Sequence, residues 1–155
     1  MSADVGVRSL ILPLDSGVLV VPASAVQEVL FAEPLDLPPP AAPEWLMGEV
    51  QVRQQTVPVV SFETLSGGEA RPTPASVHAV VLKNLSGDAE PSTYAIRLAK
   101  APRVEELDTG TLQLSDSGES DNPFIVCRVI VDGEEGGVPA LDSIVKALQE
   151  YMVSG

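Results

Sequence analysis

The stretch APEWLMGEVQVRQQTVPVV, residues 42–60, holds the clearest structural pattern in this chain of 155 residues. Polar and apolar residues alternate over residues 49–53, which places Val50 and Val52 on one face of a predicted strand and leaves the other face in water. A turn at two glutamines leads into a second apolar run, which Pro58 interrupts. Because proline cannot donate to a strand ladder, this run is predicted to lie at a sheet edge or a bulge, where an exposed edge can receive a partner.

The rest of the chain continues this β pattern. Short runs of Val, Leu and Ile recur between clusters of Gly, Pro, Asp and Ser, which is typical of an all-β sandwich or barrel rather than of βαβ units. Further strands are predicted at residues 8–14, 18–21, 77–83, 93–99, 124–131 and up to residue 141. The first two form a hairpin around Gly17, and 124–131, apolar on both faces, is predicted to be a central strand. The strands at 77–83 and 93–99 are assigned to a second lobe, so two small barrels are expected.

A short helix is predicted near residues 24–30. Ser24 precedes Gln27 by three residues, a capping-box spacing in which each side chain can satisfy a backbone N–H at a helix start. Val26 and Val29 fall on the apolar stripe of this helix, which is too short to persist alone and must dock on the strands.

A second helix is predicted near residues 143–152, with Asp142 as its cap. Its apolar stripe comprises Ile144, Val145, Leu148, Tyr151 and Met152. Prolines concentrate at residues 33–43, which predicts an extended, semi-rigid connector. Residues 108–122 are polar and acidic with little periodicity, so a mobile loop is expected there.

Composition limits the classes of partner. Hydrophobic residues make up 45% and charged residues 20% of the chain, which indicates a packed core, and the length fits a single domain over residues 1–155. A net charge of -13 opposes binding to nucleic acid or to an anionic bilayer. No apolar run reaches the length of a membrane span and the N-terminus lacks a signal-peptide layout, so membrane insertion is not expected and the cytoplasm is the expected location.

Catalytic groups are few. The chain has one histidine and one cysteine, and it has no glycine-rich phosphate loop followed by lysine. His78 lies in an apolar strand, where a partly buried ring with one satisfied nitrogen is a simpler expectation than a metal ligand or a base. Cys127 is expected to be an inert thiol. The acidic pairs at 105–106 and 134–135 diverge along the backbone and are expected at the solvated surface.

Three motifs follow one another in the sequence: VQEV at residues 26–29, APEWLMGEVQVR at 42–53 and VPVV at 57–60. In this order, after a first hairpin and around a proline-bearing connector, they resemble the CheW family of chemotaxis coupling proteins. The resemblance continues through later strands and the closing helix, so it covers nearly the whole chain. Two positions depart from the family pattern, because Gln54 stands where glycine is usual and Ser61 where aspartate is usual. These departures suggest a divergent paralogue, such as an auxiliary adaptor of the chemosensory systems that control type IV pili and twitching motility.

The resemblance implies a mainly β fold of two small SH3-like five-stranded β-barrels packed side by side. It also implies a protein with no catalytic residue, no cofactor and no metal. Family members act as scaffolds: they bind the regulatory domain of the CheA-type histidine kinase and the cytoplasmic tip of a coiled-coil chemoreceptor, which lies in a groove between the lobes. The alternatives are a generic β-barrel interaction module with another partner, and an enzyme based on carboxylates.

Carried over position by position, the resemblance assigns four residues to the receptor-binding surface: Val26, Glu28, Val29 and Arg53. Glu28 and Arg53 are expected to form an ion pair there, which contributes only about 0–1 kcal/mol to stability and instead orients the binding face. It assigns three residues to the kinase-binding surface: Val57, Pro58 and Val59. Packing in the core or in turns also accounts for the apolar residues of both sets.

Overall fold

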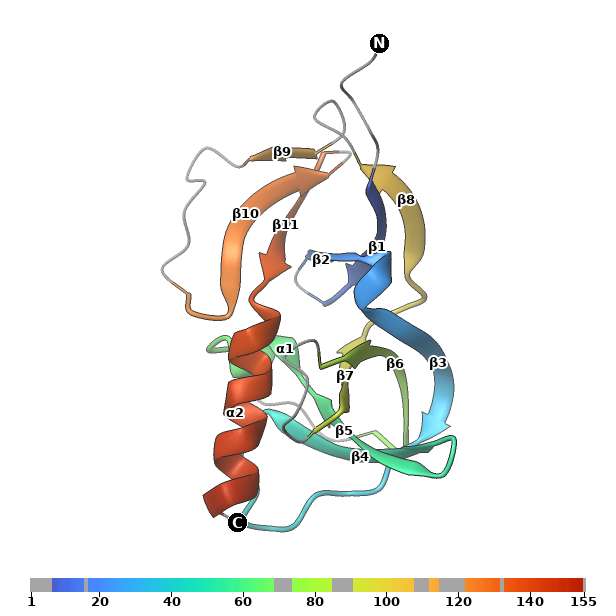
Figure 1. The fold of residues 1–155 in the computed structure, drawn as a ribbon, viewed down its shortest axis with the longest axis vertical. Coiled ribbons are helices and arrows are strands. Elements are labelled where there is room, and N and C mark those ends of the chain that lie inside the picture. Colours follow the sequence, from blue (N-terminus) through green and yellow to red (C-terminus); the bar gives the residue numbers. More distant parts are fainter. Residues whose placement is uncertain are drawn as a thin grey trace.

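The computed structural model describes residues 7–15, 17–68, 74–84, 91–107, 112–114, 122–131 and 133–154. Two β lobes lie one above the other along the long axis, and the C-terminal helix runs along one side (Figure 1). The mainly β class and the architecture of two small barrels, predicted from the sequence, are confirmed. One lobe has the expected five strands, and the other has six among the described residues.

The six-stranded lobe pairs its strands in the order β8-β1-β2-β11-β10-β9. Its strands are β1 (Val7–Pro13), β2 (Val18–Pro22), β8 (Arg103–Leu107), β9 (Leu112–Leu114), β10 (Ile125–Val131) and β11 (Glu134–Pro139). The predicted first hairpin is confirmed, since β1 and β2 pair antiparallel on either side of Gly17. β2 also pairs in parallel with β11, which joins the N-terminal hairpin to the C-terminal strands.

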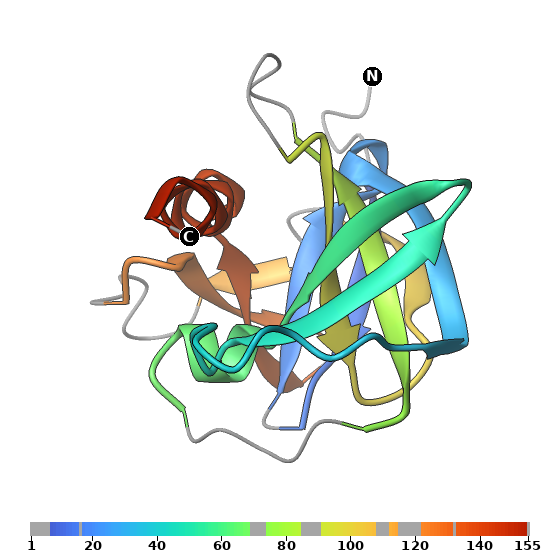
Figure 2. The same cartoon turned by 90° about the horizontal axis from the view of Figure 1, so that it is seen from below.

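The five-stranded lobe has the order β3-β6-β7-β5-β4. Its strands are β3 (Val26–Pro34), β4 (Leu46–Val52), β5 (Gln55–Val60), β6 (Ser76–Lys83) and β7 (Thr93–Leu98). Just after β3, the Asp36 amide donates to the Glu49 carbonyl at 2.8 Å, and the Glu49 amide donates to the Asp36 carbonyl at 2.9 Å. This bridge brings the end of β3 against β4, the opposite edge of the sheet, and closes the sheet into a barrel (Figure 2).

The assignment of strands to lobes from the sequence was wrong. The runs at 77–83 and 93–99 were expected to open a second lobe, but they form β6 and β7, which pair with β3 and β5 in one sheet. The first hairpin pairs instead with strands near the C-terminus. The chain crosses between lobes at the 3₁₀ turn η1 (Ala23–Ala25), after β7 and at the start of the last helix. Such crossings leave no signal in local patterns, which report strands but not their partners.

The predicted helix near residues 24–30 is also wrong. Only the single turn η1 is helical, and β3 begins at Val26 and pairs antiparallel with β6. β3 carries two irregularities, one between Val26 and Glu28 and one between Leu30 and Glu33. Each inserts an extra residue, so the apolar spacing departs from two and imitates a helical period. Pairing with β6 satisfies the backbone and overrides the local capping signal.

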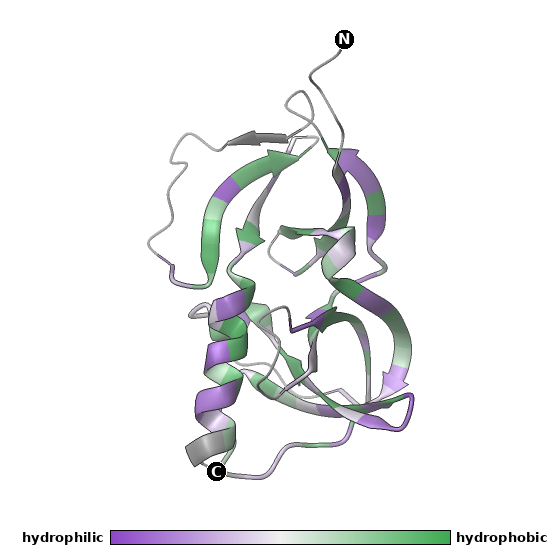
Figure 3. Ribbon diagram, viewed as in Figure 1, coloured by the Kyte–Doolittle hydropathy of each residue, from purple (hydrophilic) through white to green (hydrophobic). Residues whose placement is uncertain are grey.

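The C-terminal helix is confirmed as α2 (Leu141–Ser154). Its start is set by the backbone, because the amides of Ser143 and Ile144 both donate to the carbonyl of Ala140. Asp142, predicted as the cap, lies in the first turn, where its negative charge interacts favourably with the positive end of the helix dipole. Of the predicted stripe, Ile144, Val145 and Leu148 are buried, whereas Met152 is 47% exposed. Hydrophilic and hydrophobic bands alternate along the helix (Figure 3).

One apolar cluster is shared by both lobes and α2. It contains, among others, Leu12 and Leu19 of the six-stranded lobe, Ile96 and Leu98 of the five-stranded lobe, and Ile144 of α2. A short helix, α1 (Phe62–Leu65), also packs on this cluster and was not predicted. The lobes are therefore fixed to each other by common packing rather than linked as separate domains.

Two other predictions need correction. β10 is buried on its inner face only: Val129 and Val131 are buried, but Val126 is 62% exposed, so the strand is not apolar-packed on both faces. Within the predicted loop at 108–122, Leu112–Leu114 forms strand β9. Residues 108–111 and 115–121 of that prediction lie outside the described residues.

Candidate functional site

The assigned receptor surface begins on β3. Val26 and Val29 are partly buried and pack against the shared apolar cluster, as their core-packing role requires. Glu28 lies between them with 25% of its side chain exposed. A bulge between Val26 and Glu28 interrupts strict alternation, so Val26 and Val29 both pack on the shared cluster although three positions separate them.

Arg53 lies at the two-residue turn that joins β4 and β5, with Val52 and Gln55 paired on either side. Arg53 has φ 50° and Gln54 has φ 68°, so both central residues adopt the left-handed conformation of a type I′ hairpin turn. This conformation favours glycine, the residue that the family resemblance leads us to expect at the position of Gln54. The turn holds Arg53 outward, with 79% of its side chain exposed.

The predicted ion pair between Glu28 and Arg53 is confirmed. The Arg53 Nε donates to the Glu28 Oε1 at 3.0 Å. β3 and β4 are the two ends of the strand order, so this contact crosses the seam of the barrel. A pair this exposed contributes about 0–1 kcal/mol to stability, and its main effect is to fix the direction of two charged groups on the surface.

The assigned kinase surface is only partly at the surface. Val57 and Val59 are 0% exposed and belong to the core of the five-stranded lobe, whereas Pro58 is partly exposed. β5 lies inside the sheet, so the predicted edge strand is corrected. Pairing with β7 begins only at Val59, immediately after the proline, and this explains how an interior strand accommodates a residue without a donor.

Pro58 borders an apolar cleft of about 340 Å³. Its other walls include Pro38 and Pro39 of the connector and Tyr151 and Met152 at the end of α2. The connector is thus held near α2, and the Trp45 ring meets the Tyr151 ring edge to face with centroids 6.4 Å apart. No pattern in the sequence indicated this cleft.

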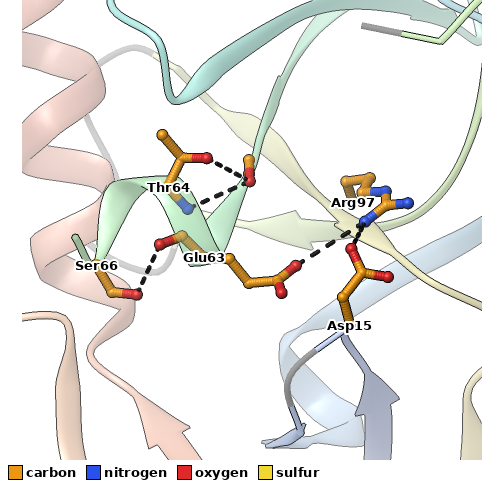
Figure 4. A network of polar contacts seen from close by, with 6 residues as sticks. Asp15, Glu63, Thr64, Ser66 and Arg97 are labelled. Atoms are coloured by element: carbon orange, nitrogen blue, oxygen red, sulfur yellow. Dashed lines mark hydrogen bonds and ion pairs between the residues drawn. The ribbon is translucent and has the colours of Figure 1, made fainter. Parts of the chain in front are cut away.

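A second cleft, of about 540 Å³, lies between the lobes and is lined by residues of β2, α1, β10 and β11. Beside it, Arg97 of β7 contacts Asp15 at 2.7 Å and Glu63 of α1, which also lines the cleft, at 3.9 Å (Figure 4). Asp15 belongs to the six-stranded lobe and Arg97 to the other, so the guanidinium joins the two. This cluster was missed, because its residues are far apart in the sequence and in no recognisable motif.

His78 and the glutamates Glu105 and Glu134, considered for chemistry from the sequence, each contact another group of the protein. His78 is partly buried and its Nδ1 accepts a hydrogen bond from the Ala32 amide at 3.0 Å, which confirms the expected satisfied nitrogen. Glu105 and Glu134, expected at the solvated surface, both contact Arg103, at 3.5 and 3.0 Å, and the Glu134 hydrogen bond raises the pKa of Arg103.

Within the described ranges, no group of three or more His, Cys, Asp or Glu residues is placed to hold a metal ion. The described helices include none that is long and apolar enough to cross a membrane. The described residues supply one apolar cleft, a second cleft with a mixed polar and apolar lining, and oriented surface charges, which are features of recognition.

The fold thus defines a mainly β protein of two SH3-like barrels side by side. The family model of the CheW-like domain matches residues 8–148, and the chain belongs to this family. Among solved structures, the chain is similar to the scaffolding protein TtCheW from Thermoanaerobacter tengcongensis, with a TM-score of 0.66 and 14% identity over 87% of this chain and 89% of that chain. No curated protein sequence matches this chain.

Proposed function

We propose that this chain is a non-catalytic, cytoplasmic adaptor that couples a CheA-type histidine kinase to chemoreceptors in a chemosensory array. The observation that carries the proposal is the contact between Glu28 and Arg53 at 3.0 Å. The family resemblance assigned these two residues to one receptor-binding surface, although they are 25 positions apart in the sequence. Membership of the CheW-like family supports the scaffold role.

On the receptor side, the proposed surface consists of the ion pair and the exposed parts of Val26 and Val29. An amphipathic helix from a receptor tip can lay its apolar stripe on the valines while the oriented charges select its register. On the kinase side, Pro58 is the proposed contact, and the buried Val57 and Val59 hold it in position.

Binding assays with purified components test this function. Glu28→Ala and Arg53→Ala are each expected to weaken binding of a receptor-tip fragment by about tenfold, which corresponds to 1.4 kcal/mol. The melting temperature should remain within about 2 °C, because exposed ion pairs stabilise little. Glu134→Ala is the matched control, since it removes a carboxylate that contacts an arginine at the same distance in the other lobe.

Wild-type protein that binds neither the kinase regulatory domain nor the receptor tip would overturn the adaptor function. Normal binding by both variants would instead remove Glu28 and Arg53 from the receptor surface. The departures at Gln54 and Ser61 support a role as an auxiliary adaptor for type IV pili and twitching. Kinase regulatory domains from pilus and flagellar systems, compared in the same assay, test that output.

A further inference from the structure

Beyond the four residues assigned to the receptor surface, β3 presents a large exposed ring. Phe31 is 59% exposed, and its ring contacts the ring of His78 on β6 edge to face, with centroids 6.1 Å apart and an interplanar angle of 61°. Val29 precedes Phe31 by two residues, with the buried Leu30 between them, so both lie on the same face of the strand, which packs on the shared apolar cluster at Val29 and is exposed at Phe31.

His78 holds the backbone beside this ring. The irregularity of β3 between Leu30 and Glu33 takes the Ala32 amide out of the strand ladder, and Ala32 adopts φ 50°. The Nδ1 of His78 accepts that amide at 3.0 Å, so the side chain replaces the lost backbone acceptor. The single histidine of the chain therefore supports both the bulge and the ring that the bulge exposes.

We propose that Phe31 is an apolar anchor for the amphipathic helix of the receptor tip, extending the surface formed by Val29 and the ion pair, and that His78 is its positioning residue. This inference rests on the proposed adaptor function and names a further contact for the same partner. Large aromatic side chains at interfaces contribute disproportionately to affinity when they become buried.

The backbone of β3 favours a helix over an added strand. β3 is an edge strand, but its two irregularities and the left-handed Ala32 break the regular row of amides and carbonyls that strand addition needs. A partner can therefore contact the side chains of β3 but cannot pair with a regular row of its backbone groups. A docked helix binds through such side-chain contacts.

Charge further defines the helix. β3 carries Glu28 and Glu33 and no basic residue, and Asp36 follows it. Glu28 already forms an ion pair with Arg53, whereas Glu33 makes no ion pair with any residue of the described ranges. The proposed helix thus has an apolar stripe that covers Phe31 and a basic side chain beside it that faces Glu33.

The test measures binding of a helical receptor-tip fragment and, separately, of the kinase regulatory domain. Phe31→Ala is expected to weaken receptor binding about tenfold and to leave kinase binding unchanged. Val126→Ala, which truncates a similarly exposed apolar residue in the other lobe, is the matched control and should change neither. Glu33→Gln should weaken receptor binding at low salt and have little effect at high salt.

His78 is tested by rescue. His78→Ala removes the acceptor for the Ala32 amide and should weaken receptor binding, whereas His78→Asn places an amide oxygen near the position of Nδ1 and should restore most of it. Equal loss in both variants would overturn the positioning role.

The outcomes separate this inference from the proposed function. Receptor binding that Glu28→Ala weakens and Phe31→Ala does not would overturn the anchor and leave the adaptor intact. Kinase binding weakened by Phe31→Ala, with receptor binding unchanged, would overturn the helix as occupant. Wild-type protein that binds neither fragment would overturn the adaptor function itself.

Discussion

At the scale of single residues, Tyr94 is the most unusual side chain of the core. It is fully buried, and its hydroxyl has no hydrogen-bond partner in the described part of the chain. Burial raises the pKa of Tyr94, and the negative charge of Asp142 raises it further. A buried hydroxyl without a partner costs about 1–3 kcal/mol, so the ring of Tyr94 fills the core while its hydroxyl lowers stability.

Tyr94→Phe keeps the ring and removes the hydroxyl, and is expected to raise the free energy of unfolding by about 1 kcal/mol at neutral pH. The wild type should also lose stability as the pH rises above about 10, because the unfolded chain then releases the tyrosine proton while the folded chain retains it. The variant should lack that part of the alkaline loss. Urea denaturation at pH 7 and at several values above pH 10 measures both effects.

Tyr151→Phe is the control for this experiment, since it removes the hydroxyl of the only other tyrosine, which is partly exposed. A loss of stability in Tyr94→Phe at neutral pH would show that the hydroxyl has a partner and contradict the argument.

At the scale of elements, the sequence predicted best where burial and local pattern agree. Burial alternates over residues 49–53 as the sequence does, with Val50 and Val52 inward, and α2 places Ile144 and Leu148 on the core. β3 failed because its bulges destroy the period of two, and bulges depend on the partner strand. The Glu28 and Arg53 contact was predictable only through family resemblance, since nothing local relates a strand to a turn 25 residues later.

Gly136 tests the junction between β2 and β11, which no local pattern indicated. It lies opposite Val18 in the parallel pair, where an added Cβ would come within 2.5 Å of the Val18 carbonyl oxygen. Gly136→Ala must therefore push the strands apart and is expected to cost about 1–3 kcal/mol. Thermal unfolding should show a fall of several degrees, at about 2–4 °C for each kcal/mol.

Gly137→Ala is the matched control one residue away, because its Cβ would meet the Cγ2 methyl of Ile125 at 3.2 Å, and a side-chain atom can move more readily than backbone. It should lower the melting temperature less than Gly136→Ala. Equal effects would mean that β2 and β11 do not approach as closely as the glycine contacts indicate.

At the scale of the whole molecule, the interleaved chain makes two barrels that cannot separate. β1 and β2 begin one lobe, β3 to β7 form the other, and the remaining strands return to the first. The common apolar cluster then fixes the lobes together. The sequence could not reveal this arrangement, because strands that are neighbours in space, such as β2 and β11, are more than a hundred residues apart. The proposed adaptor function would benefit from such rigidity, since each surface keeps a fixed direction relative to the other.

Arg97 adds an electrostatic contact to this junction. It faces Asp15 at 2.7 Å and Glu63 at 3.9 Å, and all three side chains are about a fifth to a quarter exposed, so water screens them less than a surface pair. Arg97→Ala removes the contact and leaves two carboxylates near each other. It is expected to cost about 1–3 kcal/mol, more than Asp15→Asn, while Glu63→Gln should cost least because its contact is the longest.

Chemical denaturation of the three variants tests this order, and added salt should recover part of the loss in Arg97→Ala by screening the two carboxylates. Double variants identify the source of the energy. Arg97→Ala combined with Asp15→Asn should cost less than the sum of the two single changes, because the second removes a charge that the first left without its partner. Strictly additive losses would mean that Arg97 stabilises only the five-stranded lobe. Apolar packing alone would then hold the two lobes together.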